Sequence, residues 1–130
     1  MIKIIAILGF IEIILGFFAL RFTKRICELH GNDIFQRKLR KISVIIGSVL
    51  AIASWPFTFF LGYPYSFGGE TGRIVGIPFM VAYFDSSGRD YVSTLMLPAI
   101  IGNSAFWYTV PHIIFAIYLS LHYKWKLKQT

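Results

Sequence analysis

Hydrophobic residues form long, nearly unbroken runs in this chain, and polar residues collect between the runs. Two windows, Ile2 to Leu20 and Ile42 to about Gly62, are each long and apolar enough to cross a bilayer as a helix, which takes about 20 residues. A third window runs from roughly Pro98 to Tyr123. The pattern predicts an all-α membrane protein, a single domain over residues 1–130 with transmembrane helices at about 2–22, 42–62 and 98–123.

Composition and charge support a membrane protein rather than a nucleic-acid-binding one. Hydrophobic residues make up 56% of the chain and charged residues 15%, far from the balance of a soluble domain. The net charge of +7 comes from basic residues that cluster beside the hydrophobic windows, not on a recognition motif. Ten of the thirteen follow the first or third window: Arg21, Lys24, Arg25, Arg37, Lys38, Arg40, Lys41, Lys124, Lys126 and Lys128.

The distribution of positive charge predicts the orientation. Loops rich in Lys and Arg stay in the cytoplasm, so we expect the 23–41 loop and the C-terminus there. The N-terminus and the 63–97 segment then lie outside. Positive charges follow the first apolar run, which indicates a retained helix and not a cleaved signal peptide. A multi-pass protein of a bacterial inner membrane is the expected setting.

The external segment 63–97 contains two β-rich runs separated by the turn-like sequence DSSGRD. This pattern predicts a small β-hairpin, with Pro78 at an edge or a bulge. A re-entrant segment that dips into the membrane is the alternative. Asp85 and Asp90 are expected to be solvated turn residues. The residues singled out in this segment are Gly76, Pro78, Asp85, Arg89 and Asp90.

Small residues recur at helical spacing on one face of each predicted helix. In lipid such faces let helix backbones approach closely, because packing and interhelical hydrogen bonds replace the hydrophobic drive. Each helix is therefore expected to have one face for helix contacts, and the remaining Ile, Leu and Phe to face lipid. The residues expected to pack helices are Gly9, Gly16, Gly47, Ala51, Gly102 and Ala105.

Two ionisable residues lie on these small-residue faces. Glu12 is about 15 Å along the first helix from its external end, and His112 about 21 Å along the third, at 1.5 Å per residue. A carboxylate at this depth is costly unless it is paired or protonated, so we expect Glu12 to contact His112. Asn103, Thr109 and Ser54 are candidates to extend this intramembrane polar pair.

Two interpretations of the pair stay open. It can be a buried contact that sets helix register, or a site that handles protons or cations beside Pro111, whose missing amide frees a carbonyl. No metal or cofactor is expected. The C-x-x-H spacing of Cys27 and His30 lacks the second pair of ligands that zinc requires.

Three short sequences near the end of the chain resemble a pattern in small uncharacterised bacterial three-helix inner-membrane proteins. They are G-I-P-F at 76–79, S-G at 87–88 and N-x-x-F-W at 103–107. In those proteins a Gly-Pro-aromatic external segment precedes a last helix with an Asn and an aromatic pair. The resemblance covers the last third of the chain and implies no activity.

The sequence thus favours a non-enzymatic membrane protein, either an accessory or assembly subunit of a membrane complex or a homo-oligomer. Its expected partners are the lipid bilayer and other membrane subunits or further copies, with no nucleic acid. The alternative is an oligomeric proton- or cation-coupled transporter or channel that uses Glu12 and His112. A third hypothesis, a lipid-directed enzyme, rests on Asp85, Arg89 and Asp90 at the outer surface.

Overall fold

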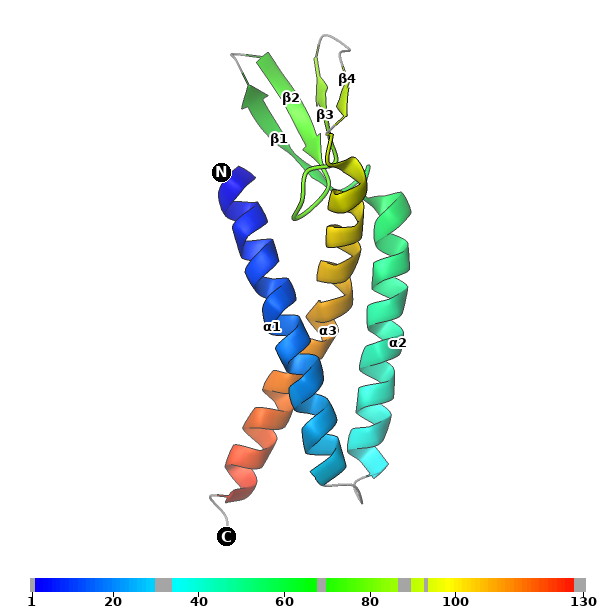
Figure 1. Cartoon of the computed structure of the whole chain (residues 1–130), viewed down its shortest axis with the longest axis vertical. Coiled ribbons are helices and arrows are strands. Elements are labelled where there is room, and N and C mark those ends of the chain that lie inside the picture. The colour runs from blue at the N-terminus through cyan, green and yellow to red at the C-terminus, as the bar shows by residue number, and fades with distance from the viewer. Residues whose placement is uncertain (1, 30–33, 68–69, 87–89, 93, 128–130) are drawn as a thin grey trace.

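Three long helices dominate the structure, a computed structural model that describes residues 2–29, 34–67, 70–86, 90–92 and 94–127. The helices are α1 (Ile2–Leu29), α2 (Ile34–Phe57) and α3 (Met96–Leu127). Each is long and apolar enough to cross a membrane, which confirms the prediction from the hydrophobic pattern. Figure 1 shows a small sheet beyond one end of the bundle, the end where the chain begins.

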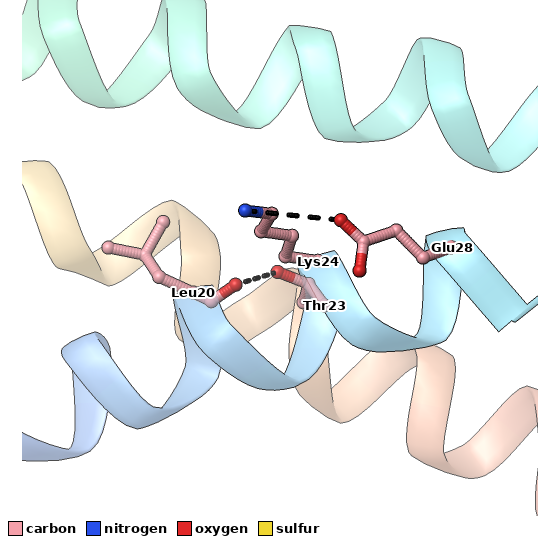
Figure 2. A network of polar contacts seen from close by, with 4 residues as sticks. All are labelled: Leu20, Thr23, Lys24 and Glu28. Atoms are coloured by element: carbon pink, nitrogen blue, oxygen red, sulfur yellow. Dashed lines mark hydrogen bonds and ion pairs between the residues drawn. The ribbon is translucent and has the colours of Figure 1, made fainter.

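The helices do not end where the hydrophobic windows end. The predicted 23–41 loop consists instead of the last turns of α1 and the first turns of α2, apart from residues 30–33, which lie outside the described residues. Arg, Lys, Glu and Leu are good helix formers, so the helices continue past the apolar windows. Lys24 and Glu28, four positions apart, form an ion pair of 3.9 Å on the surface of α1 (Figure 2).

The sheet consists of β1 (Gly62–Phe67), β2 (Glu70–Val75), β3 (Ala82–Asp85) and β4 (Asp90–Val92). It is antiparallel with strand order β1-β2-β3-β4, so each strand pairs with the next one along the chain. The predicted hairpin across DSSGRD is the β3–β4 pair, and a second hairpin, β1–β2, precedes it. α2 accordingly ends at Phe57, earlier than predicted, because β1 already begins at Gly62.

Between β2 and β3 the chain turns back from the sheet toward the helices as a loop of residues 76–80 (Figure 1). Gly76 has a φ of +95°, a conformation that glycine adopts without strain. The amide of Val81 donates to the carbonyl of Val75 at 2.9 Å and closes the loop. Pro78, expected at a strand edge or a bulge, lies inside this loop. The 63–97 segment therefore contains the predicted hairpin, and its 76–80 loop packs against the helices.

The third helix is the centre of the bundle. α1 and α2 both pack on α3 and make few contacts with each other, as Figure 1 shows for most of their length. Large apolar side chains on the outward faces are exposed, as expected of helices that face lipid. Every interhelical polar contact described below therefore involves a residue of α3.

Candidate functional site: polar contacts along α3

Three polar side chains of α3 are almost completely buried, each about 1% exposed: Asn103, Thr109 and His112. Each contacts a different part of the molecule. Asn103 contacts the 76–80 loop, Thr109 contacts α1, and His112 contacts α2. All three were singled out from the sequence, but their partners follow only from the packing.

Asn103 holds the 76–80 loop through the backbone of Phe79. Its side-chain oxygen accepts a hydrogen bond from the Phe79 amide at 2.8 Å, and its side-chain nitrogen donates to the Phe79 carbonyl at 3.0 Å. The side chain thus satisfies the two backbone groups that a strand neighbour would otherwise satisfy. A loop backbone buried against helices requires this kind of partner.

Two glycines make room for the same loop. A Cβ atom on Gly9 of α1 would collide with the ring of Pro78, and one on Gly102 of α3 would lie 2.8 Å from the ring of Phe79. These glycines were expected to pack helix against helix. The structure differs because the loop occupies the space between α1 and α3 at their outer ends, and the small residues face the loop instead.

Deeper in the bundle, Thr109 contacts Glu12 of α1. The Thr109 hydroxyl lies 3.0 and 3.1 Å from the two carboxylate oxygens of Glu12. It also lies 3.0 Å from the carbonyl of Ala105 and 2.9 Å from that of Phe106. One turn along α1, Gly16 lies directly against Thr109, where a Cβ atom would collide with the threonine side chain. Gly16 therefore sets the close approach of α1 to α3.

On the other side of α3, His112 contacts α2. Its Nδ1 atom lies 3.2 Å from the hydroxyl of Ser43, and its ring lies 5.0 Å from the ring of Tyr108, between centroids. A Cβ atom on Gly47 would lie 2.7 Å from the Tyr108 carbonyl and 3.5 Å from His112 Nε2. Nε2 itself is buried without a hydrogen-bond partner among the described residues.

The predicted contact between Glu12 and His112 does not form. Glu12 bonds to Thr109, and His112 bonds to Ser43. The prediction compared depths along two helices, but it did not include the direction in which each side chain leaves its helix. Since α3 lies between α1 and α2, its residues 109 and 112 serve two different neighbours.

A further contact links α2 and α3 nearer the sheet. The hydroxyls of Ser54 and Ser104 are 3.1 Å apart, and Ser54 also donates to the carbonyl of Ala51 at 2.7 Å. Ala51 and Ser104 line a surface hollow of about 490 Å³ together with Trp55. Sequence analysis missed Ser43 and Ser104. Ser43 was detectable, because it lies four residues before Gly47 and extends the same small-residue face by one turn.

The charged residues singled out in the 63–97 segment lie at the ends of β3 and β4 or outside the described residues. Asp85 is the last residue of β3 and Asp90 the first of β4, on either side of the turn, while Arg89 lies outside the described residues. The third hypothesis, a lipid-directed enzyme, gains no support from this part of the molecule.

Within the described part of the chain, no group of three or more His, Cys, Asp or Glu side chains could hold a metal ion. No protein-family model, curated protein or solved structure matches this chain.

Proposed function

We propose that this chain is a non-enzymatic, multi-pass protein of a bacterial inner membrane that serves as an accessory or assembly subunit, or forms homo-oligomers. Its sheet and N-terminus face outside, and the basic ends of its helices face the cytoplasm. The clustering of Lys and Arg after the first and third hydrophobic windows supports this orientation. Three helices enclose little interior, and their outward faces are broad and apolar.

A single observation carries the proposal: Glu12 is only half-buried, although it lies near the middle of an apolar helix. Among the described residues its hydrogen-bond partner is the hydroxyl of Thr109. An ionisable group at this depth requires partners, because lipid supplies none. The isolated chain leaves part of this carboxyl group uncovered, and a neighbouring subunit would cover it.

Native mass spectrometry from nanodiscs tests this role. The wild-type chain is expected as an oligomer or with co-purified membrane subunits, and Glu12→Gln is expected to lose much of this association. Glu28→Gln is the matched control, since Glu28 lies on the same helix in the exposed pair with Lys24. A wild-type chain found only as a monomer without partners contradicts the proposal.

The second candidate function is a proton- or cation-coupled transporter or channel. The observation in its favour is the buried Nε2 atom of His112, which has no hydrogen-bond partner among the described residues. Its weakness is that Glu12 and His112 lie at different interfaces of α3 and use different partners. Flux into proteoliposomes that stays unchanged in Glu12→Gln and in His112→Ala would rule it out.

A further inference from the structure

We propose that the face of α1 around Glu12 binds a transmembrane helix of a different protein, and that this helix carries a Lys or Arg side chain at the depth of Glu12. The inference rests on the proposed function, and it adds the chemistry of the partner.

Glu12 has too few hydrogen-bond donors within the chain, as the contacts around Thr109 indicate. Four acceptors surround the Thr109 hydroxyl at 2.9 to 3.1 Å: both oxygens of Glu12 and the carbonyls of Ala105 and Phe106. A threonine hydroxyl has one proton to donate, whereas an ionised carboxylate can accept about four hydrogen bonds. Thr109 therefore supplies only a small part of the hydrogen bonds that the Glu12 carboxylate can accept.

Along α1, no Lys or Arg lies within two turns of Glu12. The basic residues nearest along α1 are Lys3 and Arg21, each nine positions from Glu12, or about 14 Å along the helix axis. The sequence has no Lys or Arg in residues 42–72 or 96–123, which include most of α2 and α3. Among the described residues Glu12 forms hydrogen bonds with Thr109 and no ion pair, so a positive charge directly beside its carboxylate would come from another molecule.

The surface beside Glu12 is suited to a helix. Leu8 and Leu15 lie four residues before and three residues after Glu12, so each of these side chains neighbours Glu12 on α1. Leu8 is 59% and Leu15 56% exposed, and Phe22, one heptad beyond Leu15, is also exposed. The same spacing of three and four residues includes Ala19, which is only 8% exposed, so the open surface is the edge of this α1 face, formed by Leu8, Leu15 and Phe22.

Charge complementarity identifies the kind of partner. An ammonium or guanidinium group supplies several N–H donors and the opposite charge, which compensates a carboxylate in a low-dielectric medium. A second copy of this chain in the same orientation would present Glu12 at the same depth, and two carboxylates would repel each other. The face therefore fits a different protein better than it fits a further copy.

Synthetic transmembrane peptides test the inference directly. The probe is a Leu- and Ala-rich helix with one Lys at its midpoint, and the matched controls carry Leu or Glu at that position. Binding to the full chain is measured by energy transfer between fluorophores in phosphatidylcholine vesicles. We expect the Lys peptide to bind about tenfold more tightly than the Leu peptide, a difference of about 1.4 kcal/mol.

Two variants of the chain test whether the preference for the Lys peptide depends on Glu12. The preference for Lys should disappear in Glu12→Gln, which keeps the size of the side chain, and persist in Glu28→Gln. Equal binding of the Lys and Leu peptides, or a Lys preference that survives in Glu12→Gln, would overturn the inference. Preferential binding of the Glu peptide would also overturn it and indicate pairing of carboxyl groups between copies.

The failure of this inference is distinguishable from the failure of the proposed function. If the wild-type chain assembles in nanodiscs but shows no Lys preference, the subunit role stands and the cationic partner is wrong. If the wild-type chain is only a monomer in nanodiscs, the subunit role itself is wrong.

Discussion

The two helix interfaces of α3 contain similar residue types and differ in how completely they are closed. Toward α2, His112 is about 1% exposed and contacts Ser43, with Gly47 allowing close approach. Toward α1, Thr109 is equally buried, but its partner Glu12 is only half-buried. The α2 interface is therefore closed to the surface, although His112 Nε2 has no hydrogen-bond partner among the described residues, whereas the α1 interface contains a carboxyl group that is not fully buried.

The 76–80 loop explains part of this difference. It lies between the outer ends of α1 and α3, with Pro78 against Gly9 and Phe79 held by Asn103. The α1 interface is therefore built from a loop near the sheet and from a helix contact further inward. The α2 interface joins two helices directly.

The largest expected effect is that of Asn103→Leu. The substitution removes both hydrogen bonds to Phe79 and leaves a backbone amide and a carbonyl unsatisfied, at a cost of roughly 2 to 5 kcal/mol of unfolding free energy. Denaturant titration in detergent micelles measures this loss. A Leu variant as stable as the wild type would show that the loop does not depend on Asn103.

Valine at either packing glycine should separate one helix from α3 and spare the other. Gly16→Val collides with Thr109, and Gly47→Val collides with the Tyr108 carbonyl, so each should cost about 1–3 kcal/mol. Distances between spin labels on the outward helix faces distinguish the two variants. Gly16→Val should lengthen α1–α3 and Gly47→Val should lengthen α2–α3. Equal movement of both helices in either variant would mean that the interfaces are not independent.

Removing one hydroxyl from each interface compares how much a hydrogen bond contributes to stability at the α2 side and at the α1 side of α3. Ser43→Ala leaves His112 Nδ1 unsatisfied in a closed interface, whereas Thr109→Val removes a donor from the partly buried Glu12. We expect both losses within about 0.5 to 2 kcal/mol of unfolding free energy, with the larger one for Ser43→Ala. The same micelle titration measures both variants. The reverse order would argue that the α1 interface is the more tightly closed of the two.

The smallest expected effect is that of Lys24→Ala. The ion pair with Glu28 is exposed, and its 3.9 Å separation is long, so its loss should change the unfolding free energy by less than about 0.5 kcal/mol (Figure 2). The thermal midpoint in detergent measures it. A shift comparable to that of Ser43→Ala would show that this end of α1 packs against more than solvent.

The three helices were predicted correctly from the hydrophobic pattern, whereas their ends were not. The apolar windows predicted each span, because lipid-facing residues must be hydrophobic along the whole helix. The helix ends were missed between residues 23 and 41 because polar helix formers continue a helix without a hydrophobic signal. The sheet was predicted in part: DSSGRD marks the β3–β4 turn, while the β1–β2 hairpin was not foreseen.

By itself, the sequence determined that this chain has three helices apolar enough to cross a membrane, and that Glu12, Asn103, Thr109 and His112 are polar residues among apolar ones. Only the tertiary structure decided their partners. Depth along a helix follows from counting residues, but contact between two side chains also depends on the rotation of each helix about its axis. That rotation places Thr109 toward α1 and His112 toward α2, on adjoining faces of α3, and so Glu12 contacts Thr109 while His112 contacts Ser43.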